Sequence, residues 1–453
     1  MLKKTRPGHR NQVGIFSMEE LVPKDHLVRA VEAAIDFDFI YEMVKGLYCE
    51  DNGRPPVDPV VLFKIVFIQY IFGIKSMRQT IREIEVNVAY RWFLGMGLYD
   101  RVPHFSTFSK NYERRFAKST VFEDIFGRIL QEAVEAGFVD ASAVFIDATH
   151  IKANANKRKC SNEVVVKQAR HYQKQLDEEI NRDRAEHGKK PLKDNGNSDD
   201  DNDTPGSDIP TKNIKTSTTD PECGLFHKGE HEKQFAYTAH VACDKSNFVL
   251  AYDVSPGNVH DSVMFDGLYQ EIVYQFPQIE MVALDSGYKT PWIMKQIFDS
   301  WRLPSTPYKR PMTRQGFFKK YEFIYGEYYD CVLCPNNQVL KHSTTNRDGY
   351  REYKSNPSMC NICPHRAKCT ESKNCQKTVA LHLWQKYMDR AEDVRHSPQG
   401  KAIYTKRGQT IERVFADAKE KHGLRYTQFR GQNKVRMQVA LTFACMNEYV
   451  AVK

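Results

Sequence analysis

Two aspartates stand where a short apolar run of the sequence ends. Asp147 follows residues 143–146 in the stretch FIDATH, and Asp285 follows residues 281–284 in ALDSGYKT. Short apolar runs of this kind are typical of buried strands. A carboxylate at the end of a buried strand is costly to desolvate, and two of them on neighbouring strands repel each other unless a cation lies between them.

Oxygen ligands favour Mg²⁺ or Mn²⁺. Two such ions, about 4 Å apart, clamp the attacking and leaving oxygens of a phosphoryl displacement. Asp147 and Asp285 therefore predict a two-ion phosphoryl-transfer site, which needs a third acidic ligand. Asp261, in the stretch NVHDS, competes with Asp285 for the second position. A turn precedes Asp261 and a helix is expected to follow it, so we interpret it as a helix cap; Asp253, on the return strand of a predicted hairpin, is a weaker alternative.

The best candidate for the third ligand is Glu412, in a long helix that is expected to begin near Arg407. Glu412 and Lys419 are seven residues apart, so they share one face of that helix. Tyr404 and Arg407 precede them at the helix entry. Read singly, Lys419 is equally well explained as a solvated lysine and Tyr404 as a core residue.

These six residues, in this order, resemble the signature of one enzyme family. The chain is similar to bacterial insertion-sequence transposases of the DDE class, which carry a tyrosine-arginine-glutamate-lysine signature. The residues that carry the resemblance are Asp147, Asp285, Tyr404, Arg407, Glu412 and Lys419. Four residues separate Arg407 from Glu412, where the family usually has three. The resemblance covers most of the chain, including FIDATHIKAN, PGNVHDS and ALDSGYKT.

The resemblance implies a ribonuclease-H-like catalytic core. Asp147, Asp285 and Glu412 would then hold two divalent metal ions, Mg²⁺ or Mn²⁺. Tyr404, Arg407 and Lys419 would contact DNA at the ends of the element. The expected partners are double-stranded DNA, both terminal inverted repeats and target, and a second copy of the chain, because two ends must be paired. The expected location is the bacterial cytoplasm, at the nucleoid.

Six cysteines lie close together in the second half of the chain. Two of them form the doublet Cys331–Cys334 and two the doublet Cys360–Cys363, and Cys369 and Cys375 follow. Paired CxxC units match the knuckles that hold structural zinc with four thiolates. A proline follows the second cysteine of both doublets, which favours Cys331, Cys334, Cys360 and Cys363 as the ligands. Cys369 could replace Cys331, and His365 is a weaker substitute.

Composition and patterning predict a two-part, non-membrane protein. The chain has 453 residues, a net charge of +9 and 41% hydrophobic residues. Its most apolar stretch, residues 60–74, is short for a membrane span and contains Lys64 and Gln69, so a buried helix is expected. We expect an all-helical DNA-binding domain over residues 1–137 and an α/β catalytic domain with a mixed sheet over residues 138–453. A flexible charged insertion (about 154–223) and a cysteine-rich zinc insertion (about 320–375) would interrupt the second domain.

Within the helical domain, several start and stop signals are visible. Asp58 followed by proline, Ser76 with Gln79, and Thr120 with Glu123 predict helix starts. An apolar face runs from Met77 to Trp92, and Gly137 predicts a helix end. Six basic residues on the polar faces are equally compatible with DNA contact and with plain solvation: Arg78, Arg82, Arg91, Lys110, Arg114 and Arg115.

Together these observations predict a transposase that cleaves element ends and joins the freed 3′-hydroxyl to target DNA. Two other classes compete with it. One is a ribonuclease-H-like nuclease without joining activity, against which the end-binding signature argues. The other is a catalytically inactive DNA-binding protein, against which the intact set Asp147, Asp285 and Glu412 argues.

Overall fold

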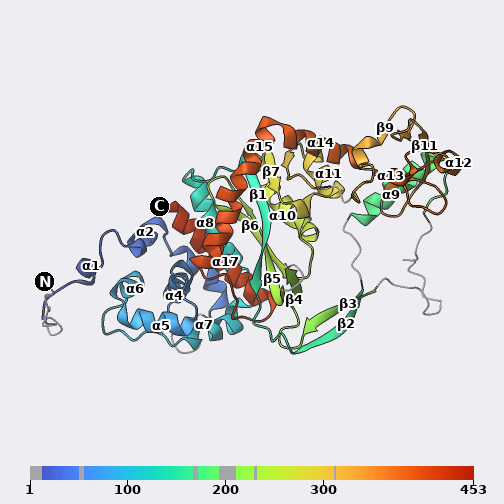
Figure 1. Ribbon diagram of the computed structural model, residues 1–453. Coiled ribbons are helices and arrows are strands. Elements are labelled where there is room, and N and C mark those ends of the chain that lie inside the picture. Colours follow the sequence, from blue (N-terminus) through green and yellow to red (C-terminus); the bar gives the residue numbers. More distant parts are fainter. Residues whose placement is uncertain are drawn as a thin grey trace, which may run out of the picture.

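A mixed sheet lies at the centre of the molecule, between the N-terminal helices at one end and the cysteine-rich segment at the other (Figure 1). The computed structural model describes residues 13–49, 56–166, 172–192, 211–228, 232–310 and 313–452. β1 (Ala143–Lys152) pairs in parallel with β7 (Met281–Leu284), and β7 in parallel with β8 (Leu303–Ser305). On its other edge β1 is antiparallel to β5 (Glu232–Cys243), which is antiparallel to both β6 (Val249–Pro256) and β4 (Gly224–Lys228). The predicted mixed α/β sheet is confirmed.

The register of the two central strands decides where the aspartates lie. Ile146 on β1 stands opposite Leu284 on β7, and the two strands run in parallel. Asp147 follows Ile146 and Asp285 follows Leu284, so the two aspartates lie side by side at the same level. Asp147 was expected to end its strand, but β1 continues to Lys152 because residues 147–152 stay paired with β5; only Asp285 follows the last residue of its strand. Helices α10 (Asp261–Gln275) and α11 (Pro291–Asp299) accompany these strands, and Thr290 caps α11 as its sequence indicates.

The N-terminal region is helical, as expected. Its helices are α1 (Met18–Leu21), α2 (Leu27–Ala34), α3 (Phe39–Val44), α4 (Pro59–Ile71), α5 (Met77–Val86), α6 (Val88–Phe93), α7 (Ser106–Asn111) and α8 (Val121–Glu135). Asp58 caps α4, and the side chain of Ser76 accepts the Gln79 N–H at the start of α5. Gly137 ends α8 with a φ of 75°, which glycine adopts at little cost.

Two details of the helical region differ from the prediction. The apolar face from Met77 to Trp92 is not one helix, because Asn87 ends α5 and its side chain caps α6. Thr120 precedes α8 but does not cap it, since its hydroxyl donates to Asp124 instead. Both differences arise from local side-chain hydrogen bonds that compete with the helical backbone.

A helix from the C-terminal end of the chain completes the hydrophobic core of the N-terminal helical region. The long helix expected near Arg407 is instead four elements: α15 (Pro398–Thr405), a 3₁₀ turn η5 (Lys406–Gln409), α16 (Ile411–Glu420) and α17 (Gln432–Ala451). α17 packs against α4 and α8 on one side and β6 on another, and its residues belong to one hydrophobic core shared with the N-terminal helices. Residues 1–137 therefore do not form their core alone.

α17 carries a buried acid into that shared core. Glu448 is 1% exposed, and within the described part of the chain neither carboxylate oxygen has a hydrogen-bond partner. Burial raises its pKa well above the usual value, the charges of Glu132 and Glu32 raise it further, and Lys64 opposes them. The folded protein therefore holds this proton at a pH where the unfolded chain has lost it.

Glu448→Gln is expected to flatten the pH dependence of stability. In the wild type the free energy of unfolding should fall as the pH rises from the unfolded pKa toward the folded one, by at most about 1.4 kcal/mol per pH unit from this group. Urea unfolding between about pH 5 and pH 8 measures this slope. The exposed Glu85→Gln is the control and should leave the slope unchanged. An equal slope in wild type and Glu448→Gln would contradict the assignment.

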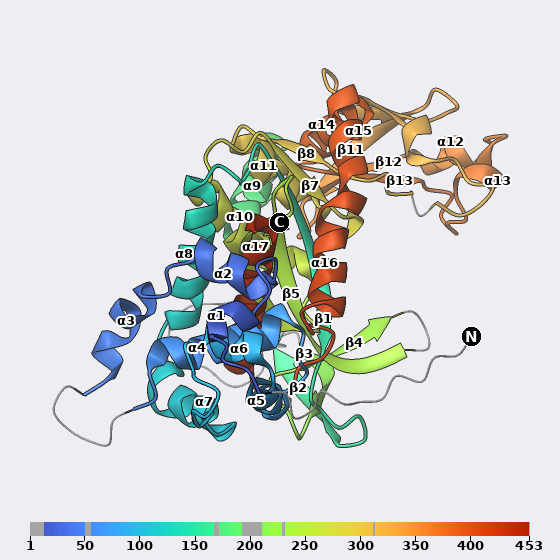
Figure 2. The same cartoon turned by 90° about the vertical axis from the view of Figure 1, so that its left-hand side faces the viewer.

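Helix α9 (Gln173–Glu186), from the first insertion, meets the cysteine-rich segment at the end of the molecule far from the N-terminal helices, whereas the pair of strands β2 (Cys160–Val166) and β3 (Thr211–Ser217) of the same insertion lies below the central sheet (Figures 1 and 2). The cysteine-rich segment forms an antiparallel sheet of β9 (Ile324–Gly326), β10 (Cys331–Leu333), β11 (Val339–Thr345), β12 (Tyr350–Lys354) and β13 (Thr378–His382), with a small core of its own. α14 (Gln385–His396) then leads back to the central sheet.

The other insertion was expected to be flexible over residues 154–223, and its described parts are folded instead. β2 pairs with β3, and α9 buries Leu176 and Ile180 completely. The apolar spacing of those two residues gives α9 a face to bury, which the charged composition concealed. The acidic run of residues 193–208 lies outside the described residues. Among the described helices, none is long and apolar enough to cross a membrane.

Candidate active site

An arginine joins the two neighbouring aspartates. Arg407 is 5% exposed, and its Nη2 donates to Asp147 Oδ2 in a short ion pair, while Nη1 lies 3.4 Å from Asp285 Oδ1. The predicted convergence of the two aspartates is thus present in the structure. Arg407 was expected to contact DNA; its guanidinium is instead directed at the carboxylates, a role that the sequence did not indicate.

The pKa of Asp147 is shifted by its burial and by the neighbouring charges. Burial raises its pKa to about 6, the Arg407 charge opposes that rise, and the carboxylates of Asp285 and Asp261 add to it. Asp285 is more open, with 49% of its side chain exposed. The pair therefore has one buried and one solvent-facing member, compensated by a single fixed cation. A buried acid whose pKa is shifted by a specific charge partner is a common property of functional sites.

Glu412 lies at the edge of this group. It is exposed in the first turn of α16, a helix that packs against β1. Its Oε2 is 3.7 Å from the place that a Cβ on Gly408 would occupy, so the side chain folds back toward the segment that carries Arg407. The extra residue between Arg407 and Glu412 is accommodated by η5 and by an irregular backbone at Thr410. Among the described contacts, none joins Glu412 to either aspartate, so its role as third ligand stays a prediction.

Asp261 is a neighbour of the aspartate pair rather than a helix cap. The cap of α10 is His260, whose side chain accepts the Ser262 N–H, and Asp261 is the first helical residue. Burial raises the pKa of Asp261, and so does the charge of Asp285. The interpretation of Asp261 as a cap was wrong because a histidine took that position. Asp253, the weaker alternative, is paired with Arg436.

Two buried groups adjoin these acids. The hydroxyl of Tyr288 is buried and, among the described residues, has no hydrogen-bond partner; burial raises its pKa strongly, and the charges of Asp261 and Asp147 raise it further. His240 Nδ1 lies 3.9 Å from Asp261 Oδ1, and burial lowers the pKa of this histidine to about 4, so it is neutral near pH 7. Sequence analysis missed both, although GYKT and TAH adjoin predicted strands.

The other two signature residues lie on either side of Arg407. Tyr404, in α15, has its ring centre 5.8 Å from the Arg407 guanidinium carbon. Lys419, in α16, lines a cavity of about 600 Å³ between the helical region and the α16–α17 connection, together with Tyr70, Phe105 and Tyr426. The two residues thus flank the aspartates at opposite ends of the η5–α16 segment.

Two family models match the chain. Residues 16–114 match the family described as Transposase domain (DUF772), and residues 333–450 match the family described as Transposase DDE domain. The chain therefore carries two transposase domains, the second of which is a DDE domain. The second match contains Arg407, Glu412 and Lys419, and the first covers most of the helical region of the transposase. No curated protein sequence matches the chain.

Two solved structures are distantly similar to the transposase. One is the piggyBac transposase synaptic complex with hairpin DNA, at 8% identity and a TM-score of 0.35, over 94% of this chain and 74% of that one. The other is the Mos1 transposase paired-end complex with the left transposon end, at 12% identity and a TM-score of 0.16, over 56% of this chain and 60% of that one. Both scores are low, so the assignment rests on the family models.

In the cysteine-rich insertion of the transposase, Cys334, Cys360 and Cys363 are near enough to Cys369 for their charges to act on its thiol, but among the described residues no three thiols lie within 4.8 Å of one another. Burial raises the pKa of Cys369, and the charges of Cys334, Cys360 and Cys363 add to the rise. Cys334 Sγ accepts the Gln338 backbone N–H at 3.4 Å, and Cys363 Sγ accepts the Asn336 amide at 3.6 Å. Four soft thiols with N–H donors are a donor set that suits zinc.

The sequence favoured Cys331 as a zinc ligand. The structure places its thiol beside the neighbouring strand β9. Its Sγ is 3.7 Å from the position that a Cβ on Gly326 would take, on the neighbouring strand β9. Gly326 is the cross-strand partner of Cys331, so this contact follows from the pairing of β9 with β10. The choice between Cys331 and Cys369 as the fourth ligand stays a prediction.

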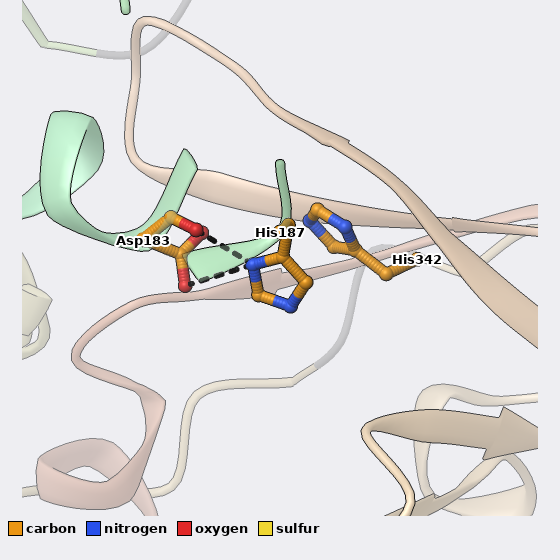
Figure 3. A group of neighbouring side chains, drawn as sticks. All are labelled: Asp183, His187 and His342. Atoms are coloured by element: carbon orange, nitrogen blue, oxygen red, sulfur yellow. Dashed lines mark hydrogen bonds and ion pairs between the residues drawn. The ribbon is translucent and has the colours of Figure 1, made fainter. Parts of the chain in front are cut away.

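A second polar cluster joins α9 to the cysteine-rich sheet (Figure 3). Asp183, His187 and His342 lie within 4.8 Å of one another, close enough to hold a metal ion. We interpret the cluster as an ion-pair network instead. Asp183 is already neutralised by Arg351 and accepts the Thr345 hydroxyl, and His187 Nε2 is bonded to Asp330 Oδ2 at 2.8 Å. The rings of His187 and His342 lie 3.8 Å apart at an interplanar angle of 31°.

Proposed function

We propose that this transposase cleaves DNA at the ends of a mobile element and joins the freed 3′-hydroxyl to target DNA. The observation that carries the proposal is the pair Asp147 and Asp285, placed side by side by parallel strands and compensated by Arg407. The sheet order β6-β5-β1-β7-β8, in which only β5 runs against the others, supports the ribonuclease-H-like class.

The donor set fits divalent ions. Asp147 and Asp285 offer hard oxygen ligands, and Glu412, five residues after Arg407, would be the third. Two neighbouring acids, one of them mostly buried, need positive charge. The chemistry that two Mg²⁺ or Mn²⁺ ions supply when bound is charge stabilisation at the attacking and leaving oxygens of phosphorus. Asp147 and Asp285 would fix the site where two rigid strands lie side by side, and Arg407 would hold the carboxylates in place.

DNA is the proposed partner along two regions. Tyr404 and Lys419 would contact the element end near the cleavage point, and the helical region would recognise its sequence. Of the six basic residues on that region, Arg78, Arg82, Lys110 and Arg114 are exposed. Arg91 is buried and donates to the carbonyls of Gly97 and Asp100, so it is structural. Because two ends are paired in transposition, we propose a homodimer.

The proposal is tested by incubating the full chain with Mg²⁺ and DNA that carries the element end. Joined product is expected. Nicked product without joining would favour the nuclease, and bound but intact DNA would favour an inactive DNA-binding protein. A structural zinc ion in the cysteine-rich insertion, held by Cys334, Cys360, Cys363 and Cys369, is proposed as a stabilising element only.

Arg407→Gln is expected to make stability depend more strongly on Mg²⁺. Without the guanidinium the two aspartates lose their compensating charge, which should lower the free energy of unfolding in the absence of metal by about 3 kcal/mol. A divalent ion then replaces more of the missing charge, so Mg²⁺ should raise the melting temperature of the variant more than that of the wild type. Thermal unfolding with and without Mg²⁺ measures both effects. The exposed Arg413→Gln is the control; equal Mg²⁺ shifts in all three proteins would contradict the site.

A further inference from the structure

The cysteine-rich insertion and its flanking segments carry more positive than negative charge. Residues 309–377 contain thirteen lysines and arginines and six aspartates and glutamates, a net charge of +7, of which +2 falls within residues 320–375. Four thiolates on one zinc ion would lower the total of +7 by two charges and leave it positive. A local excess of this size, at the end of the molecule far from the N-terminal helices, favours a polyanionic partner there (Figure 1).

The same insertion exposes two aromatic rings on a tight turn. Tyr328 and Tyr329 are 90% and 79% exposed, in the turn between β9 and β10. Their ring centres are 4.8 Å apart at an interplanar angle of 85°, so each ring leaves a face open. Ile324, before the turn, is also mainly exposed. Large apolar side chains gathered at one tip are typical of a contact surface rather than of plain solvent exposure.

Hydrogen bonds to Asp330 hold the Tyr328–Tyr329 turn in place. Asp330, which closes it with a φ of +40°, accepts the hydroxyls of Tyr325 at 2.9 Å and Tyr353 at 2.6 Å. Its other oxygen bonds to His187 Nε2 at 2.8 Å. His187 in turn bonds through Nδ1 to the backbone of Asp183, so the network of Figure 3 supports the turn. The strained backbone and three anchors imply a preorganised tip, which loses little entropy on binding.

Positive side chains lie beside this tip. In the sheet register Cys331, the first residue of β10 after the turn, stands opposite Lys341, and Lys341 stands opposite Lys354 on the next strand. Lys354 is paired with Glu352 at 3.3 Å, whereas Lys341 is exposed. Lysine is depleted at protein–protein interfaces, whereas a basic groove beside stacking aromatics is typical of surfaces that bind nucleic acid.

We propose that the Tyr328–Tyr329 turn contacts DNA that has unpaired or unstacked bases, with its rings against the base faces and Lys341 at the adjoining phosphates. The inference rests on DNA as the partner in the proposed function. It adds a third contact region, separate from the helical domain and from the signature residues. The supporting network explains why α9, from one insertion, is docked on the sheet of the other.

The test compares binding by the full chain to a fully paired duplex and to the same duplex with a short run of unpaired bases, in the absence of Mg²⁺. The double variant Tyr328→Ser, Tyr329→Ser is expected to bind the unpaired DNA about tenfold more weakly, with a smaller effect on the paired duplex. Lys341→Gln should instead reduce the salt dependence on both DNAs, by about one unit in the slope. Tyr274→Ser, which removes a tyrosine that is 89% exposed on α10, is the matched control and should bind as the wild type does.

Melting temperatures equal to that of the wild type would establish that the variants are folded. If wild type and double variant bind the unpaired DNA equally, the surface does not contact bases and the inference is overturned. Loss of self-association in the double variant, with DNA binding intact, would overturn it in favour of an interface between two copies of the chain. A wild type that binds neither DNA would overturn the proposed function together with this inference.

Discussion

Replacing Asp147 with asparagine is expected to reduce Mg²⁺-dependent strand cleavage by about a thousandfold or more, with DNA affinity retained. Asparagine keeps the shape of the side chain and can still accept the Ala148 backbone N–H, which lies 2.8 Å from Asp147 Oδ1. What it removes is the negative charge that faces Arg407 and, in the proposed site, a divalent ion. DNA affinity should survive because phosphate contacts elsewhere carry it.

The chain offers a closely matched control. Asp253 also lies on a strand of the central sheet, also accepts the N–H of the following residue and is also paired with an arginine, Arg436. Asp253→Asn should therefore reproduce every local effect of the substitution and leave cleavage unchanged. Equal cleavage by Asp147→Asn and Asp253→Asn would refute the catalytic assignment.

The same assay decides which acid is the second ligand. Asp285→Asn should match Asp147→Asn, because parallel pairing places the two carboxylates at one level. Asp261→Asn should lose less activity, since Asp261 acts on the pair through its charge and not through the shared arginine. The opposite order, with Asp261→Asn inactive and Asp285→Asn active, would give the second position to Asp261.

Replacing Cys369 with serine is expected to remove zinc from the protein, while Cys331→Ser leaves about one zinc per chain. The reason is positional: the thiol of Cys369 is charge-coupled to those of Cys334, Cys360 and Cys363, and that of Cys331 faces Gly326. Metal analysis of protein prepared without chelator measures both contents. Zinc retained by Cys369→Ser but lost by Cys331→Ser would restore the two CxxC doublets as the ligand set.

Loss of zinc should unfold the cysteine-rich insertion and leave the rest of the protein folded. Binding of a structural zinc ion supplies on the order of 10 kcal/mol of folding free energy, far more than a small core provides. The insertion has its own cluster of Phe323, Val332, Leu340, Tyr353 and Val379, separate from the main core. Cys369→Ser should therefore become sensitive to protease within residues 313–382, while the main thermal transition stays. Cys375→Ser, which removes another cysteine of the segment, should behave as the wild type.

The sequence by itself determined the elements that carry the chemistry. An apolar run before Asp147 and another before Asp285 predicted two buried strands, and the structure has β1 and β7 there. Local signals also placed the start of α4 correctly, because a capping aspartate followed by proline fixes a helix start whatever surrounds it. The family, too, was visible in six residues and their order.

Only the tertiary structure decided which side chains meet. The burial of Arg407 against two aspartates depends on how η5 lies across two strands more than 120 residues earlier, and spacing along the chain does not encode that packing. The folding of β9 and β10 placed Cys331 opposite Gly326, a pairing that the CxxC pattern does not predict. The charged segment of residues 173–186 folds as α9 because Leu176 and Ile180 are buried in the core. Asp330 holds the Tyr328–Tyr329 turn through hydrogen bonds to His187, in one insertion, and to Tyr353, in the other. Long-range contacts of this kind form only when the whole chain is packed. Residue types therefore predicted the kind of site, and packing decided which side chains contact one another in it.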